Sequence, residues 1–385
     1  MKKEKLALFL FVDAFGWEIL QKNSFFLKDK IIDKRKLETV FGYSSACDPS
    51  IISGKSPSEH GHWNSFYYAP KTCPYKWLKY LSFLPNKLMN HHRVRSKLSS
   101  WIKKIHGFTG YFMLYNVPFK HLPFFDYAEK KRIWEPGGLN HGESIFDELQ
   151  KRNVNFHTHH YGQSDDAKIS KLEDKIKNQS IEFAYVSMGG LDSLMHSVGT
   201  QHKKVEKQVR WYDKRLRKTL DLAENHYQEV KFYVFTDHGM HNTQSIYDLQ
   251  AAVGTLDLQY NKDYVAVYDS TMARFWYFND KARQEVRSLL NGSGRGRILS
   301  DEQLKSMGVY FEDQKFGEDI FLMNSGEQIC PSYMGENFTP GLHGYDPKDK
   351  DSYAQICGNR TLRKDLQSIK DIYKVMVDEM NWLLS

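Results

Sequence analysis

The chain has 385 residues, of which 41% are hydrophobic, and it carries a formal net charge of +7. This length and apolar content exclude a disordered chain and suffice for a large core, either in two domains or in one α/β domain with insertions. Four cysteines without CxxC spacing argue against a disulfide-built secreted fold and fit a reducing compartment. The positive charge favours an anionic partner, such as a phosphate ester, a nucleic acid or a lipid headgroup.

The first predicted element is a strand at residues 6–12, a continuous apolar run of the kind found in central parallel strands. Lysines precede it as in a signal peptide, but the run is short, has no small-residue cleavage site and ends at Asp13. No segment reaches the ~18–20 apolar residues of a membrane span. We therefore expect a cytoplasmic protein without a transmembrane helix, whose first strand delivers Asp13 to its carboxyl end.

Small and hydroxyl-bearing residues dominate residues 42–64. They predict a short helix over residues 49–53, with Pro49 in its first turn. Hydroxyl groups near a helix N-terminus are well placed for an anion, because the free amides and the helix dipole favour negative charge there. An ordinary capped helix has the same composition, so both interpretations stay open.

Residues 60–125 contain no Asp or Glu. Aromatic residues, including Trp77 and Trp101, lie among the basic ones, and the pattern predicts helices near residues 75–84 and 92–105. The basic residues are Lys71, Lys76, Lys79, Lys87, Arg93, Arg95, Lys97, Lys103, Lys104 and Lys120.

We interpret residues 65–135 as a basic, aromatic insertion over the core of a single domain spanning residues 1–385. A cap for an anionic substrate is the favoured role, and a solvated basic face is the second. A patch for a membrane surface or a nucleic acid is the third. Peripheral membrane contact through residues 71–106 therefore stays open, whereas no stable nucleic-acid complex is expected.

Two further strands, at residues 182–188 and 231–235, also end in polar residues. Asp192 and His196 follow the first strand; because they are four residues apart, a helical turn would place them on one face. Asp237 and His238 follow the second strand directly. The carboxyl ends of parallel strands meet at one edge of a sheet, so these side chains are expected to lie together.

The rest of the pattern predicts a doubly wound, mostly parallel α/β sheet with helices on both faces. Helices are predicted at residues 203–225 and 365–384. The runs at residues 264–268 and 273–278 are interpreted as further strands. A turn-rich loop at residues 339–347 carries His343.

Three carboxylates, three imidazoles and one hydroxyl form the candidate metal site. Mixed oxygen and nitrogen ligands suit Zn²⁺, or secondarily Mn²⁺, better than Ca²⁺. Their number supplies two divalent metal sites with three protein ligands each and a shared nucleophile. The residues are Asp13, Ser44, Asp192, His196, Asp237, His238 and His343.

The chain resembles the alkaline phosphatase superfamily and, within it, the type I phosphodiesterase and nucleotide pyrophosphatase branch. Four motifs spanning residues 12–346 carry the resemblance. They are Val12-Asp13-Ala14, the stretch from Ser53-Gly54 to His60-Gly61, Asp192 with His196, and Thr236-Asp237-His238-Gly239-Met240 with the later Leu342-His343-Gly344-Tyr345. The resemblance implies hydrolysis or transfer of a phosphate ester, with a phosphodiester or pyrophosphate favoured over a monoester. An anionic small molecule or a glycan or lipid phosphoester is the expected substrate.

The resemblance also implies roles for individual residues. The family nucleophile lies nine residues before the Thr or Ser of a TG-like dipeptide, so counting back from Ser53 gives Ser44, with Ser45 as the rival. Asn64 resembles the family's phosphate-binding asparagine, although an ungapped count places it one position early. One metal would be held by Asp192, His196 and His343, and the other by Asp13, Asp237, His238 and the nucleophile.

Two alternatives remain. Cys47 begins a stretch that resembles part of the sulfatase Cys-x-Pro-x-Arg signature, but Ile51 stands where the arginine is needed. A metal-containing, catalytically weak protein that binds an anionic glycan, nucleotide or lipid is the other alternative. Metal content and turnover of aryl phosphodiesters distinguish an enzyme from such a binding protein.

Overall fold

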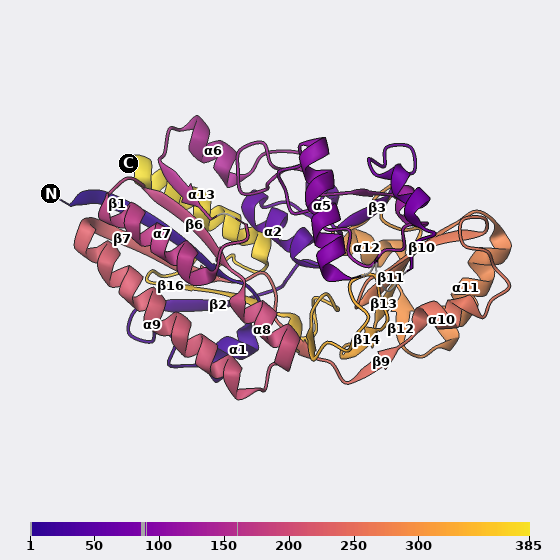
Figure 1. Cartoon of the computed structure of the whole chain (residues 1–385). Helices are drawn as coiled ribbons and strands as arrows, with labels where there is room; N and C mark the ends of the chain where they lie inside the picture. The colour runs from indigo at the N-terminus through magenta and orange to yellow at the C-terminus, as the bar shows by residue number, and fades with distance from the viewer. Residues whose placement is uncertain (1, 86–88, 90, 160) are drawn as a thin grey trace.

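A computed structural model describes residues 2–85, 89, 91–159 and 161–385. Its main feature is a six-stranded sheet in the order β2-β16-β7-β1-β6-β5 (Figure 1). Strand β1 pairs in parallel with β6 and β7, β6 pairs in parallel with β5, and β16 runs antiparallel to β7 and β2. The predicted mostly parallel α/β sheet is thus confirmed. The strands are β1 (Lys3–Val12), β2 (Asp33–Leu37), β5 (Phe156–Thr158), β6 (Phe183–Met188), β7 (Tyr227–Phe235) and β16 (Ala354–Gly358).

Strand β1 is apolar because helices cover both faces of the sheet. Alternate side chains of a strand point to opposite faces. Phe9 and Phe11 pack in a cluster with α2 (Ser44–Ser53), α6 (Ile145–Lys151) and α13 (Ile372–Leu384), whereas Leu8 and Leu10 pack in a second cluster with α7 (Asp165–Lys177) and α9 (Lys203–His226). The predicted helices on both faces are therefore present.

A second sheet lies beside the first and has four antiparallel strands in the order β10-β11-β13-β12. The expectation that residues 264–268 and 273–278 extend the doubly wound sheet was wrong, since they form β10 and β11 here. Only Asp269, Ser270 and Thr271 separate these two strands, whereas parallel neighbours need a crossover of about a dozen residues or more. The strands are β10 (Tyr264–Tyr268), β11 (Met272–Tyr277), β12 (Gly296–Ile298) and β13 (Asp319–Met323).

Residues 65–135 pack on this second sheet. The ring of Tyr68 stacks on that of Trp276 at 5.6 Å between centroids, and the ring of Phe125 lies 5.8 Å from the same indole. The inserted region and the second sheet therefore share one apolar core. The region forms β3 (Phe66–Tyr68), η1 (Lys76–Leu81), α5 (His92–His106), η2 (Leu122–Phe124) and β4 (Phe125–Tyr127).

Two predicted helix boundaries differ from the structure. Pro49 lies inside α2, which begins at Ser44, because the carbonyl of Tyr43 already accepts the amides of Ala46 and Cys47 at 2.7 and 3.1 Å. The C-terminal helix begins at Ile372. It follows a 3-10 turn, η4 (Ile369–Asp371), whose N-terminal end is capped by a capping box. The first difference matters for function, because it puts Ser44 at the start of a helix.

The remaining elements are short connections. None of the helices in the described part of the chain is long and apolar enough to cross a membrane. The remaining helices are α1 (Trp17–Lys22), α3 (Pro57–His60), α8 (Gly190–Val198), α10 (Leu249–Gly254), α11 (Asp280–Gly292), α12 (Asp301–Ser306) and η3 (Lys350–Ser352). The remaining strands are β8 (His241–Asn242), β9 (Ser245–Tyr247), β14 (Glu327–Ile329) and β15 (Gly341–Leu342).

A buried ion pair ties the second sheet to the segment that carries Asn64. Arg274 is fully buried, and its Nε donates to Asp269 Oδ2 at 3.0 Å. Its Nη1 donates to the carbonyl of Phe66 at 2.7 Å, and Asn64 Nδ2 donates to the same Asp269 oxygen at 3.1 Å. One carboxylate thus fixes both β11 and Asn64.

We expect Arg274→Met to lower the free energy of unfolding by about 3–5 kcal/mol, because it leaves the Asp269 carboxylate buried without its cation. Urea denaturation followed by circular dichroism measures this loss. The control is Arg363→Met, which removes an exposed pair with Asp365 and Asp378 and should leave the midpoint almost unchanged. Equal losses of unfolding free energy in the two variants would contradict a stabilising role for the buried pair of Arg274 and Asp269.

Candidate active site

Polar side chains gather where β1, β6 and β7 end. These strands are neighbours in the sheet, so their carboxyl ends lie at one edge. Asp13 follows β1, while Asp237 and His238 follow β7. Helix α8 begins directly after β6 and carries Asp192 and His196 on one face.

His343 reaches this edge through a two-residue strand pair. Strand β15 pairs antiparallel with β8, which places Leu342 opposite His241. Glycine is needed at position 341, because a Cβ atom there would lie 2.4 Å from the carbonyl oxygen of Met195 in α8. The His343 ring consequently stacks on that of His238, with 3.7 Å between centroids.

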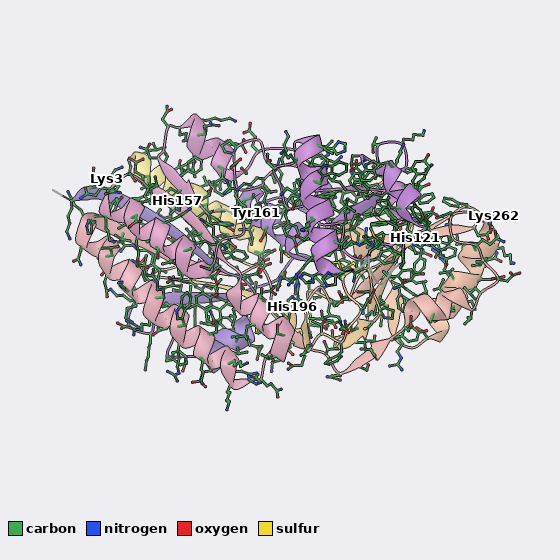
Figure 2. All side chains as sticks on the ribbon, viewed as in Figure 1. Lys3, His121, His157, Tyr161, His196 and Lys262 are labelled. Atoms are coloured by element: carbon green, nitrogen blue, oxygen red, sulfur yellow. The ribbon has the colours of Figure 1, made fainter. Side chains whose placement is uncertain are left out.

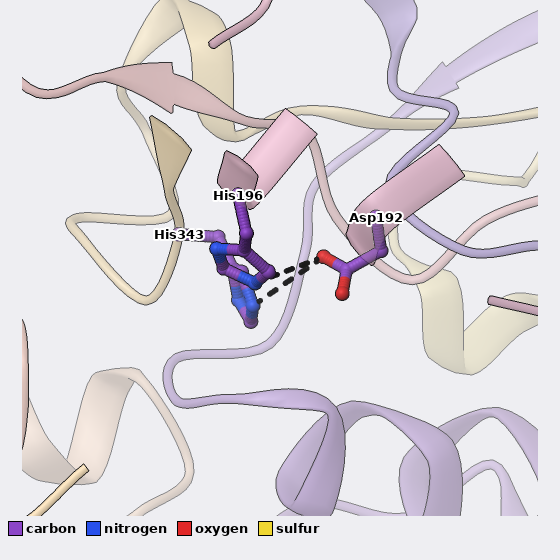
Figure 3. A group of neighbouring side chains, drawn as sticks. All are labelled: Asp192, His196 and His343. Carbon is purple, nitrogen blue, oxygen red and sulfur yellow. Dashed lines mark ion pairs between the residues drawn. The ribbon is translucent and has the colours of Figure 1, made fainter. Parts of the chain in front are cut away.

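Asp192, His196 and His343 form the first group (Figure 3). Asp192 Oδ1 lies 3.2 Å from His196 Nε2 and 3.8 Å from His343 Nε2. His196 Nδ1 lies 2.7 Å from the carbonyl oxygen of Gly341, which can only accept, so Nδ1 carries the proton. In the neutral ring Nε2 is then unprotonated and faces Asp192, as a metal ligand must.

His238 is at the centre of the second group. Its Nε2 lies 3.0 Å from Asp237 Oδ2, 3.7 Å from Asp13 Oδ1 and 3.3 Å from Ser44 Oγ. Its Nδ1 donates to the carbonyl of Gly239 at 2.9 Å, which again leaves Nε2 for the cluster. The structure thus brings together all seven residues predicted for the metal site.

Asp192 links the two groups. Ligand atoms of Asp13, Asp192 and His238 lie within 4.8 Å of one another, as do those of Asp192, His196 and His343. The resemblance instead groups Asp13 and His238 with Asp237, which here touches His238 directly. The two groups therefore form one continuous cluster, with Asp192 between them.

The electrostatics of the cluster favour a bound cation. Burial, together with Asp237 and Asp192, raises the pKa of Asp13 well above its usual value. Burial also lowers the pKa of His343 well below its usual value, with His238 and His196 adding to the effect. Asp13 Oδ1, Asp192 Oδ1 and Asp237 Oδ2 are buried and have no hydrogen-bond partner among the described residues.

These observations test whether divalent cations fit the cluster. The cluster offers buried carboxylate oxygens that have no hydrogen-bond partner among the described residues. Next to them lie imidazole nitrogens that backbone carbonyls orient. Such a set of donors suits Zn²⁺ or Mn²⁺. The residues present fit the metals that the sequence predicts.

Two hydroxyls lie at the start of α2 and have different partners. Ser44 Oγ faces His238, whereas Ser45 Oγ donates to the carbonyl of Trp63 at 3.1 Å. The first amides of a helix have no intrahelical acceptor and can donate hydrogen bonds to an anion. The helix start therefore combines one hydroxyl facing the cluster with the amides of Ser44 and Ser45, because the next two amides already donate to the carbonyl of Tyr43.

A cavity of about 700 Å³ opens over this cluster. Tyr161 and His196, both labelled in Figure 2, line it from different parts of the chain. The lining of the cavity includes the aromatic side chains of Tyr111, Tyr115 and Trp134, all from the inserted region. A substrate much larger than a phosphate group can therefore occupy the site.

Asn64 lines the same cavity. Its Oδ1 accepts from the amide of Ser65 at 2.7 Å, and its Nδ2 donates to Asp269 at 3.1 Å. A side-chain amide has two N–H groups, so one remains for a ligand. Its phosphate-binding role stays a prediction.

Sequence reasoning missed three charged residues of the cavity: Asp48, Glu129 and Lys168. Asp48 follows Ser44 by four residues, so the helical period would have placed them on one face if the true start of α2 had been recognised. Lys168 Nζ donates to the carbonyl of Ser187 at 2.8 Å. Glu129 lies outside any periodic segment, and no sequence signal marks it.

Cys47 lies within α2 on the side that faces the core, and its Sγ is 3.5 Å from Thr39 Oγ1. Burial raises the pKa of this thiol well above its usual value. The sulfatase interpretation requires a modified cysteine at the reacting centre, and the position of Cys47 gives it no support.

A mostly parallel α/β sheet with acids and imidazoles at its carboxyl edge defines the class: a hydrolase with the fold of the alkaline phosphatase superfamily. The chain belongs to the type I phosphodiesterase / nucleotide pyrophosphatase family, whose family model matches residues 7–346. The resemblance seen in the four motifs is thereby confirmed. The protein is an enzyme of the phosphodiesterase type.

Solved structures of similar fold agree with this assignment. Murine ectonucleotide pyrophosphatase / phosphodiesterase 5 matches with a TM-score of 0.67 and 14% identity over 98% of this chain and 95% of that chain. The human protein of the same name gives the same values, as does an inactive form of the murine protein in complex with AMP. At this identity the likeness shows the fold alone. A comparison with curated proteins gave no match.

Glu129 is held in the cavity wall by two donors. Its Oε1 accepts from the amide of Tyr111 at 2.8 Å and from the hydroxyl of Tyr161 at 2.7 Å. Burial raises the pKa of Glu129 to about 7. The folded protein therefore binds a proton here that the unfolded chain releases near pH ~4.3.

Because the pKa is raised in the folded state, the ionised form of Glu129 destabilises the fold, and stability falls as pH rises from about 4.3 to 7. We expect Glu129→Gln to remove this loss, so that the variant gains up to about 3 kcal/mol relative to wild type between pH ~4.3 and ~8. Urea midpoints at both pH values measure the gain. Glu312→Gln, at an exposed position, is the control, and an equal gain there would contradict the prediction.

Proposed function

We propose that the enzyme hydrolyses a phosphodiester or pyrophosphate, or transfers its phosphoryl group, through a covalent intermediate on Ser44. Family membership supports phosphodiester or pyrophosphate hydrolysis as the reaction class. The single observation that carries the choice of nucleophile is the position of Ser44 Oγ, 3.3 Å from His238 Nε2 at the start of α2.

Two divalent cations complete the proposed site, with Zn²⁺ favoured and Mn²⁺ as the alternative. Asp192, His196 and His343 would hold one ion. Asp13, Asp237 and His238 would hold the other, next to Ser44. When bound, such ions lower the pKa of a coordinated hydroxyl and neutralise charge on the phosphate group.

The chain's own groups account for the remaining requirements. Ser44 Oγ forms a bond to phosphorus while the bond to the leaving group breaks, and water or an acceptor alcohol later releases the phosphoryl group. The amides of Ser44 and Ser45 at the start of α2 and the remaining N–H of Asn64 would orient the nonbridging oxygens. The Ser45 hydroxyl is engaged by Trp63, which favours Ser44 over this rival.

The cavity wall supports a substrate with a second substituent on phosphorus. Tyr111, Trp134 and Tyr161 offer rings for packing, and Asp48 and Glu129 can accept hydrogen bonds from hydroxyl groups. A glycan or lipid phosphoester, or a small anionic ester with a nucleotide-like substituent, meets these requirements. We expect no stable complex with nucleic acid.

The cytoplasm is the proposed compartment. The cysteines Cys47, Cys73, Cys330 and Cys357 are all free and buried, which suits a reducing environment. Fractionation of cells that express the full chain tests this proposal, and recovery outside the cytoplasmic membrane would reject it.

We expect Ser44→Ala to lower kcat for bis(p-nitrophenyl) phosphate at least about 1,000-fold, since it removes the attacking oxygen. Ser45→Ala should stay within a few-fold of wild type, because its hydroxyl is bound to the Trp63 carbonyl. Release of p-nitrophenolate measures both rates. Wild-type turnover by Ser44→Ala rejects the covalent mechanism on Ser44. If only Ser45→Ala loses activity, Ser45 is the nucleophile in place of Ser44.

We expect the purified protein to contain two equivalents of Zn²⁺ or Mn²⁺ by elemental analysis, and chelation to remove the metal, the activity and part of the thermal stability together. Asp237→Asn should lower the metal content, because it removes a buried carboxylate of the cluster. Asp257→Asn, at an exposed position far from the cluster, should retain both equivalents. A fully active, metal-free protein would refute the proposal.

A further inference from the structure

Large apolar side chains are exposed on one surface of the inserted region. Tyr80, Phe83, Trp101 and Ile105 have exposed fractions of 70, 79, 51 and 56%, so none of them belongs to the core. Tyr80 lies in η1, Phe83 in the turn after it, and the other two in α5. The Trp77 ring meets that of Trp101 edge-on at 5.3 Å between centroids, which joins η1 and α5 into one surface.

Helix α5 has an apolar stripe on each of two faces. Ile102 faces the core and is 1% exposed, so burial explains it. Trp101 and Ile105 are four residues apart on the exposed face, where Lys97 and Lys104 flank them at helical spacing. The exposed face of an ordinary surface helix is polar, so folding does not explain these two apolar residues.

The same surface is strongly cationic. Residues 60–125 contain no acid. No described residue forms an ion pair with the exposed basic side chains of η1, of the turn before η1, or of α5. Lys87 of this segment lies outside the described residues. The basic residues considered are Lys71, Lys76, Lys79, Arg93, Lys97 and Lys104. We call this surface, with the four exposed apolar residues, the basic face.

We propose that the basic face docks on an anionic lipid bilayer. Lysines around exposed Trp, Phe and Ile residues are the composition of interfacial helices, whose apolar side chains enter the headgroup region while the cations meet anionic lipid. Single-stranded nucleic acid would use the rings as stacking platforms, but an aliphatic Ile105 beside Trp101 offers no such platform. Charge complementarity together with this aliphatic residue favours the membrane.

Docking would also bring the cavity close to the bilayer. Lys103, in the last turn of α5, donates to the carbonyl of Gly110 at 2.5 Å, and the next residue, Tyr111, lines the cavity. Helix α5 is thus hydrogen-bonded to the segment that carries a cavity-lining residue. The docking itself does not depend on the chemistry at Ser44, so a failure of the proposed reaction would leave it intact.

The test is sedimentation of the full-length protein with vesicles of phosphatidylcholine alone or with one quarter phosphatidylglycerol. We expect at least about tenfold tighter binding to the anionic vesicles, and at least about a tenfold loss of that binding in 0.5 M salt. Lys97→Glu/Lys104→Glu should lose binding at least about tenfold. Lys207→Glu/Lys214→Glu changes the net charge equally on the exposed side of α9 and should bind like wild type.

Insertion of the apolar residues is measured separately. Quenching of tryptophan fluorescence by brominated lipid should be weaker in Trp101→Phe than in wild type, and Trp101→Ser should weaken binding several-fold. Thermal melts confirm that each variant is folded. Each variant should turn over soluble bis(p-nitrophenyl) phosphate at the wild-type rate. Equal binding to both vesicle types, equal loss in the α9 control, or tighter binding to single-stranded RNA than to vesicles would overturn the proposal.

Discussion

Repulsion among buried carboxylates is the constraint on which this structure depends. Asp13 and Asp237 follow the ends of adjacent strands, and Asp192 lies in the first turn of α8 next to them. The influence of Asp237 and Asp192 adds to burial in raising the pKa of Asp13. Unit charges a few ångströms apart in a poorly solvated site interact by several kcal/mol. Imidazoles offset this only in part, because burial keeps the pKa of His343 low. A cation of charge two would resolve the conflict, and its binding would then stabilise the fold at this edge.

The fold holds this unfavourable arrangement with groups that are not part of the cluster. Asp165 accepts the amides of Gly189 and Gly190 at 3.1 and 2.9 Å and fixes the turn from β6 into α8. A Cβ atom on Gly190 would lie 2.6 Å from the same carboxylate, so a larger residue there would displace it. The carbonyls of Gly239 and Gly341 orient His238 and His196. The cluster is therefore pre-organised by backbone geometry.

Sequence alone predicted those site residues whose position in the fold follows from a local sequence pattern. Asp13 and Asp237 directly follow apolar runs, and the end of a buried strand fixes the sheet edge where they emerge. Asp192 and His196 follow from helical spacing. His343 was singled out only as the histidine of a turn-rich loop, without a position in the sheet, because β8 and β15 are two-residue strands without a hydrophobic pattern. Its place depends on tertiary pairing that no local signal encodes.

The errors have equally local causes. Proline is common in the first turn of a helix, and this preference hid the true start of α2 and with it the shared face of Ser44 and Asp48. Residues 264–268 have the composition of a central strand, and only the short connection to the next strand distinguishes a hairpin from a parallel neighbour. Glu129 and Tyr161 lie in irregular segments, so their meeting in the cavity wall could not be read from periodicity.

The inserted region contributes to two surfaces of this protein, the cavity and the basic face. Tyr68 and Phe125 pack on Trp276 of the second sheet, so the region cannot move away without exposing that shared core. The same region supplies Tyr111 and Tyr115 to the cavity and the exposed rings of the basic face. One packed region thus carries both surfaces. If the basic face docks as proposed, it would determine which molecules reach the cavity, and the polar cluster would determine what happens to them.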